Sequence, residues 1–176
     1  MRNDLGFKRI ATEEAFATHE ILKAYRDLLA RNGSQDIGFN SLMGYYLNNP
    51  SGRTRAVSER LQDLGARRIA DMDATGIDVQ VLSLTSPGVQ IFDADTAAGL
   101  ARAANDELAA AIAAHPNRYA GLAAIAPQNP AAAAAELERG VRTLGLKGAI
   151  INSHTHGQYL DDPKFWDILA AAEALD

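Results

Sequence analysis

Apolar and polar residues alternate along this chain in two different rhythms. Short apolar runs rich in β-branched residues predict strands at residues 9–13, 77–84, 119–126 and 147–152. Longer segments, in which apolar residues recur at helical spacing, predict helices at residues 18–32, 53–75, 95–115, 129–144 and 164–175. Strands that alternate with helices in this order are typical of β-α-β units built on a parallel sheet.

Residues with capping chemistry mark several of the predicted helix ends. Thr18 is suited to accept a backbone N–H at the start of the first helix, and Gly33 is suited to end it. Gly76 follows the second helix where a left-handed cap is expected. Asn129, which a proline follows, supplies an N-cap for the fourth helix.

The predicted elements amount to four β/α units in series. Such a series is half of a (β/α)₈ barrel of the TIM type, whose usual length is about 250 residues. It also suits a doubly wound open sheet, and the pattern alone does not choose between the two folds. Residues 33–52, rich in Gly, Asn and Ser, are predicted as an irregular excursion, and long excursions are often functional.

Composition narrows the possible partners. The 176 residues, 47% of them hydrophobic, are enough for one globular domain. Lys and Arg number 17 against 22 for Asp and Glu, with no basic stripe, so nucleic acid is not an expected partner. The chain has no cysteine, no apolar run of the ~20 residues that span a membrane, and no signal-like apolar region before residue 10, so we expect a cytoplasmic protein.

Polar residues collect where the predicted strands end, which is where parallel α/β folds carry their chemistry. Glu13 and Glu14 adjoin at the end of the first strand, so their side chains are expected on opposite faces, with Arg9 and Ala11 on the face of Glu13. On the residues alone, both carboxylates also fit solvated charges at a strand end. The hydroxyls and backbone amides of residues 85–90 fit either a simple turn or a site for a substrate oxygen.

Two histidines follow the fourth strand. His154 and His156 would share a face and could bind one metal ion if residues 152–157 stay extended. Histidines in loops are more often surface or hydrogen-bonding groups, and that interpretation stays open beside the metal pair.

Several segments together resemble the amidohydrolase-superfamily decarboxylases that act on aromatic acids. The resemblance starts with the segment Arg-Ile-Ala-Thr-Glu-Glu-Ala-Phe-Ala-Thr at residues 9–18. It continues, in the order and spacing of that family, at residues 68–78, 84–90, 104–106 and 148–155. Several motifs in the right order are more specific than any one of them, and the match spans most of the chain.

The resemblance implies roles at the first strand and in the excursion. Glu13 matches the family's metal-ligand glutamate, whereas Ala15 stands where many relatives carry a second ligand, a histidine. Arg53 and Tyr46 resemble the arginine and the aromatic residue that contact the substrate. A guanidinium group is well suited to hold a carboxylate at two points.

The later motifs imply further contacts with the substrate. Thr85 would lie in the wall of the pocket, and Asn152 and His154 near its floor. His156 matches no ligand position of the family. The remaining metal ligands and the catalytic acid would follow Asp176, so the chain is expected to be the N-terminal half of a longer parent protein and inactive by itself.

For that parent, the resemblance implies non-oxidative decarboxylation of a small phenolic acid at a divalent metal, with Mn²⁺ expected and Zn²⁺ as the alternative. It also implies a homo-oligomer, either a dimer or a tetramer. Two other classes stay open: a hydrolase or hydratase of the same superfamily, and a non-catalytic α/β fragment.

Overall fold

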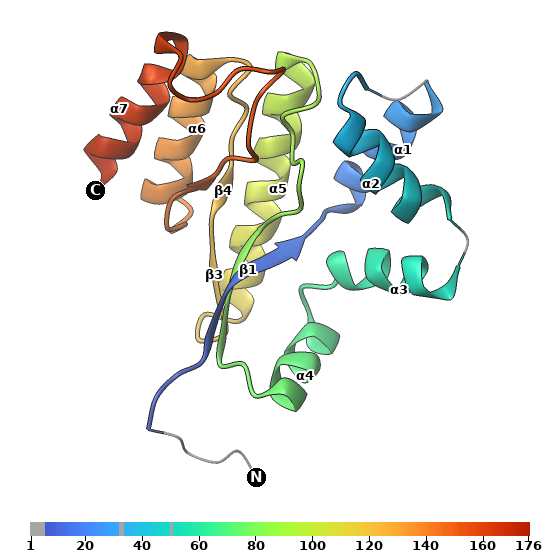
Figure 1. Cartoon of the computed structure of the whole chain (residues 1–176). Helices are drawn as coiled ribbons and strands as arrows, with labels where there is room; N and C mark the ends of the chain where they lie inside the picture. Colours follow the sequence, from blue (N-terminus) through green and yellow to red (C-terminus); the bar gives the residue numbers. More distant parts are fainter. Residues whose placement is uncertain (1–5, 32–33, 50) are drawn as a thin grey trace.

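The computed structural model describes residues 6–31, 34–49 and 51–176, in which parallel strands lie beside a row of helices (Figure 1). The strands are β1 (Ile10–Phe16), β2 (Val79–Leu84), β3 (Tyr119–Gly121), β4 (Ala123–Ala124) and β5 (Ala149–Ile150). The helices are α1 (His19–Ala30), α2 (Ile37–Asn48), α3 (Gly52–Leu61), α4 (Ala66–Thr75), α5 (Ala94–Ala114), α6 (Pro130–Arg142) and α7 (Trp166–Leu175), and a short 3₁₀ turn, η1 (Pro163–Phe165), leads into α7. None of the helices in this part of the chain is long and apolar enough to cross a bilayer.

The strands follow one another in space in the order in which they occur along the chain. β1 pairs with β2, β2 with β3, and β4 with β5, all in parallel. The break between β3 and β4 is a change of partner within one extended run. The N–H of Leu122 donates to the carbonyl of Leu82 at 2.9 Å, and the next N–H, of Ala123, donates to Gly148 at 2.8 Å. The predicted third strand therefore connects the two halves of the sheet.

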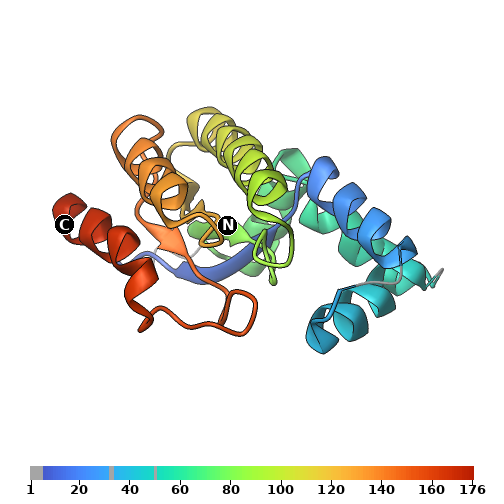
Figure 2. The same ribbon diagram turned by 90° about the horizontal axis from the view of Figure 1, so that it is seen from above.

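The helices cover one face of these strands. Along β2, Leu82 and Leu84 are buried, whereas Val81 and Ser83 on the other face are only partly buried. The buried face lies against α5, because a Cβ on Gly121, the register partner of Leu82, would fall 2.7 Å from a methyl group of Leu108. Figure 2 shows α5, α6 and α7 side by side along this face.

This arrangement confirms the barrel class and excludes the doubly wound alternative. A doubly wound sheet reverses its strand order and carries helices on both faces. Here the order runs in one direction and the helices lie on one face, as in the wall of a (β/α)₈ barrel.

Most of the predicted cap signals are confirmed. The Thr18 hydroxyl accepts the N–H of Ile21 at 3.1 Å, and Asn129 caps α6 in the same manner. Gly76 ends α4 in the left-handed region, with φ of +73°. Gly33, the predicted end of the first helix, lies outside the described residues.

One predicted helix, at residues 53–75, is in fact two. α3 ends at Leu61 and α4 starts at Ala66. Between them the Asp63 carboxylate accepts the N–H of Gly65 at 2.8 Å, and the Asp63 carbonyl accepts from Arg68 Nε at 2.7 Å. An aspartate that binds the backbone two residues ahead forms a turn without disturbing the apolar spacing, so periodicity did not reveal the break.

The predicted irregular excursion also contains a regular element. α2 occupies residues 37–48. Asp36 is its N-cap, and the carboxylate of Asp36 accepts the N–H of Phe39 at 2.8 Å. Phe39 and Met43, one turn apart, supply its buried contacts. The prediction was wrong because the Gly, Asn and Ser content concealed a helix held by a cap and a narrow apolar stripe.

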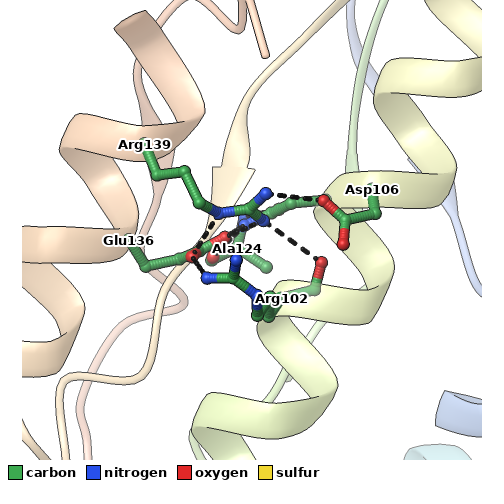
Figure 3. A network of polar contacts seen from close by, with 6 residues as sticks. Arg102, Asp106, Ala124, Glu136 and Arg139 are labelled. Atoms are coloured by element: carbon green, nitrogen blue, oxygen red, sulfur yellow. Dashed lines mark hydrogen bonds and ion pairs between the residues drawn. The ribbon is translucent and has the colours of Figure 1, made fainter. Parts of the chain in front are cut away.

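A buried amide joins the sheet to α5 and α6. Asn105 is fully buried, and its side chain pairs with the backbone of Ala124 at both ends, each bond 2.8 Å long. Its amide nitrogen also donates to Glu136 at 2.8 Å. Glu136 in turn accepts two bonds from Arg139, which reaches Asp106 at 2.7 Å (Figure 3). The hydrogen bonds to Glu136 raise the pKa of Arg139, so its guanidinium stays charged.

We expect the amide at Asn105 to be required for stability. Asn105→Asp keeps the shape but loses both N–H donors and sets a carboxylate against Glu136, so it should lower the free energy of unfolding by roughly 2 to 4 kcal/mol. Asp106→Asn is the matched control at an exposed ion pair and should change the free energy of unfolding by less than about 1 kcal/mol. Chemical denaturation at neutral pH measures both, and equal effects would contradict the assignment.

Candidate functional site

A β-bulge in β1 determines where its two glutamates point. Ala11 is in register with Gln80 and Glu14 with Leu82, so β1 has two residues where β2 has one. Ala11 and Glu14 thus share the helix-covered face with Gln80 and Leu82. Glu13 lies within the bulge, on the other face, and is exposed.

The opposite orientation of the two carboxylates agrees with the sequence-based expectation. The expectation that Arg9, Ala11 and Glu13 share one face was wrong, because the bulge interrupts the alternation of side chains. Glu13 itself belongs to the side that forms the lumen in a closed barrel.

Glu14 belongs to a structural cluster. It accepts a hydrogen bond from Gln80 Nε2 at 3.0 Å, and Gln80 accepts one from Arg68 at 3.2 Å. Arg68 also donates to the carbonyl of Ala15 at 2.9 Å, and its burial lowers its pKa. Through these bonds Glu14 helps to hold α4 against β1 and β2.

A tight turn follows β2, as predicted. The N–H of Gly88 donates to the carbonyl of Thr85 at 2.8 Å, and Thr85, which is 9% exposed, donates its own N–H to Phe16 at 2.8 Å. The hydroxyl of Tyr25 donates to the Gly88 carbonyl at 2.7 Å. Burial raises the pKa of the Tyr25 phenol, so it remains a donor at ordinary pH.

The segment after β5 is bent, which argues against the metal pair of histidines. Ser153 and His156 have φ of +55° and +51°, and Thr155 donates its N–H to Gln158 at 2.8 Å. Alternate residues share a face only in an extended segment, so the condition under which His154 and His156 could bind one ion is not met. His156 is exposed.

His154 has the chemistry of a donor to substrate. Its Nδ1 accepts the N–H of Gly157 at 3.2 Å, so the proton of the neutral ring resides on Nε2. In this tautomer the Nε2–H is a hydrogen-bond donor. The ring is partly buried and lies edge-on to Tyr159, with 5.9 Å between centroids.

Gln90 connects the ends of β2 and β5, and sequence reasoning missed it. Its side-chain oxygen accepts the N–H of Asn152 at 2.5 Å, and its nitrogen donates to the His154 carbonyl at 3.1 Å and to the Thr155 hydroxyl at 2.7 Å. The sequence contains no local signal for these bonds, since the partners are more than sixty residues away.

A cavity of about 1340 Å³ opens between these loops and the start of α2. Asn152 and His154 line it, together with Pro87 from the turn after β2 and Phe39 from α2. A space of this kind at the carboxyl ends of parallel strands is the expected place for a ligand in this fold.

The other predicted site residues do not line this cavity. Thr85 directly precedes Ser86 and Pro87, which do line the cavity. Tyr46 is on α2, partly buried and edge-on to Tyr45, and Arg53 is exposed in the first turn of α3. Within the described residues no group of three or more His, Asp or Glu side chains gathers at one point, so Glu13 is not part of such a group there.

The chain belongs to the amidohydrolase family, whose model matches residues 19–176. Among solved structures, it is 52% identical to the 5-carboxyvanillate decarboxylase of Novosphingobium aromaticivorans, crystallised with manganese and 4-hydroxy-3-methoxy-5-nitrobenzoic acid. The TM-score is 0.94 over 98% of this chain and 49% of that one. The 5-carboxyvanillate decarboxylase of Sphingomonas paucimobilis is 43% identical, with a TM-score of 0.85 over 96% of this chain and 49% of that one.

A curated relative points the same way. The γ-resorcylate decarboxylase of Polaromonas is 36% identical over 96% of this chain and 48% of its own length. The chain thus spans about half the length of the relatives it matches. These findings confirm the resemblance to aromatic-acid decarboxylases.

The approach of Gly88 to Asn152 yields a test of the site. A Cβ on Gly88, whose φ is +65°, would fall 2.7 Å from the Asn152 amide nitrogen. Gly145, with φ of +72°, has open space at the same point. Gly88→Ala should therefore cost roughly 1 to 2 kcal/mol more of unfolding free energy than Gly145→Ala, which carries the backbone strain alone. Equal losses in denaturation would show that the contact has no energetic effect.

Proposed function

We propose that residues 1–176 form the N-terminal half of a metal-dependent barrel that decarboxylates a phenolic benzoate without an oxidant. One observation carries the proposal. Over nearly its whole length, the chain matches in sequence and fold an enzyme crystallised with manganese and a hydroxy-methoxy-nitrobenzoic acid, at 52% identity and a TM-score of 0.94. The hydroxylated or methoxylated benzoate is the class of substrate we infer.

The proposed metal ligand in this chain is Glu13. Its carboxylate is a hard oxygen donor that suits Mn²⁺, or Zn²⁺ as the alternative. It is exposed on the lumen side, and no ion pair or hydrogen bond to another described residue occupies it. One carboxylate does not complete a catalytic metal site, so the other ligands would have to come from outside these residues. When bound, the ion supplies Lewis acidity and a template for the substrate.

The other residues would bind and orient the substrate. The exposed guanidinium of Arg53 can hold a carboxylate at two points, and Tyr46 offers an aromatic face to the ring. Thr85 would form part of the pocket wall. Asn152 and His154 would contact substrate oxygens at the floor, His154 through its Nε2–H. A substrate that is already oriented loses less translational and rotational entropy on the way to the transition state, which lowers the activation barrier.

The reaction itself needs a proton and releases CO₂. A proton is added to the ring carbon that carries the carboxylate, the bond to the carboxylate breaks, and its electron pair restores the aromatic ring. The acid that supplies the proton would lie outside this chain. Protonation before bond cleavage is the step that a positioned substrate makes easier.

We further propose that the parent works in the cytoplasm as a homo-oligomer, a dimer or a tetramer, with neither nucleic acid nor membrane as a partner. The absence of cysteine and the net charge of −5 support this setting.

The parent protein, expressed with Mn²⁺, should release CO₂ from hydroxy- or methoxy-substituted benzoates such as 5-carboxyvanillate and γ-resorcylate. Product formation by chromatography and CO₂ release measured together test this outcome. A hydrolase or hydratase of the same family would convert other substrates without CO₂, and a protein that neither binds Mn²⁺ nor turns over any of these acids would support the non-catalytic alternative.

Adjacent substitutions in β1 test the choice of ligand. Glu13→Gln removes the anionic donor and should reduce both manganese content and kcat/KM at least about 100-fold. Glu14→Gln is the matched control; it faces the helices and binds Gln80, so bound manganese should stay close to the wild-type amount. Metal analysis of the purified variants separates the two, and a reversed result would assign the metal to Glu14.

A further inference from the structure

The backbone conformation of the segment after β5, residues 152–158, is not stabilised by the segment's own hydrogen bonds alone. Ser153 and His156 both lie in the left-handed region, which costs free energy for residues other than glycine. Its internal bonds hold only residues 154–158: His154 Nδ1 with the N–H of Gly157, and Thr155 with Gln158. The start of the segment, at Asn152, needs support from elsewhere.

That support comes from a single side chain. Gln90 accepts from Asn152 and donates to His154 and Thr155, so each of its polar hydrogens and its oxygen are used within the segment. Gln90 is 4% exposed, which keeps water from competing for these bonds. An amide is required, because the partners are one N–H donor and two oxygen acceptors.

The backbone beneath Gln90 is itself fixed. Gln128 donates to the carbonyls of Val89 and Phe92 at 2.8 and 3.0 Å, and Tyr25 donates to that of Gly88 at 2.7 Å. Gln90 therefore extends from an anchored strand end to the bent segment. Its three bonds transmit that fixed position to the part of the segment that contains Asn152 and His154, which line the cavity.

We propose that Gln90, which borders the cavity, is a positioning residue of the active site: its polar groups are all bonded to the segment after β5, so it acts on the substrate by holding Asn152 and His154. The role of Gln90 toward the substrate rests on the proposed function, but its hold on the segment after β5 does not. Loss of Gln90 should leave the fold standing while residues 152–155 become mobile, so substrate binding should suffer more than turnover.

The experiment compares Gln90→Leu with Gln128→Leu in the parent protein. Both remove a buried amide near residues 88–92, but only Gln90 contacts the segment after β5. Hydrogen exchange of the backbone amides of residues 152–155, KM, kcat and Tm are measured for each. Gln90→Leu should increase the exchange rate about tenfold and raise KM about tenfold, with a smaller change in kcat. Gln128→Leu should lower Tm but change exchange and KM by less than about threefold, because it leaves the three bonds of Gln90 in place and Tyr25 still holds the backbone at Gly88.

A milder pair covers the case in which Gln90→Leu does not fold. Thr155→Val removes one of the three bonds and keeps the shape, so it should change exchange and KM in the same direction by about threefold. Thr155→Ser keeps the hydroxyl and should resemble wild type.

The proposal is overturned if Gln90→Leu and Gln128→Leu lower Tm alike while exchange and KM of both stay at the wild-type values. A wild-type protein that releases no CO₂ would count against the proposed function alone. In that case, hydrogen exchange still supports or overturns the hold of Gln90 on the segment.

Discussion

One-sided burial of a parallel sheet is the constraint on which the rest of this structure depends. Leu82 and Leu84 of β2 pack beneath the helices, whereas Val81 and Ser83, which alternate with them, do not. A sheet covered on one face and built in chain order curves into a barrel wall, with its second face toward the lumen. The proposed contacts of Glu13, Asn152 and His154 follow from that division, because the second face and the strand ends remain open for chemistry.

Buried amides hold the structure at the points where regular pairing stops. Asn105 pairs with Ala124 where the third strand has changed partner from β2 to β5, and Gln90 binds the segment that leaves β5. An amide suits both places because it offers a donor and an acceptor to backbone groups that no neighbouring strand pairs. Fully satisfied, such a group specifies one geometry; the same burial makes its loss costly.

The sequence predicted those features that depend on neighbouring residues. The caps at Thr18, Gly76 and Asn129 were correct because cap chemistry acts over three or four residues. The division at Asp63 and the helix α2 were missed, since one leaves the apolar spacing unchanged and the other has little of it. Gln90 and the bend at residues 153–156 depend on contacts across the sheet, which no local pattern reports.

The pair Glu13-Glu14 shows how one added residue in a strand decides which of two adjacent, identical side chains faces the helices. The bulge inserts Glu13 while returning Glu14 to register with Leu82. Glu14 is then used by Gln80 beneath the helices, and Glu13 is left on the open face. Without the bulge the strand would turn a different residue toward the lumen at this level. Whether Glu13 can serve as a ligand therefore depends on the backbone register of β1 as much as on its carboxylate.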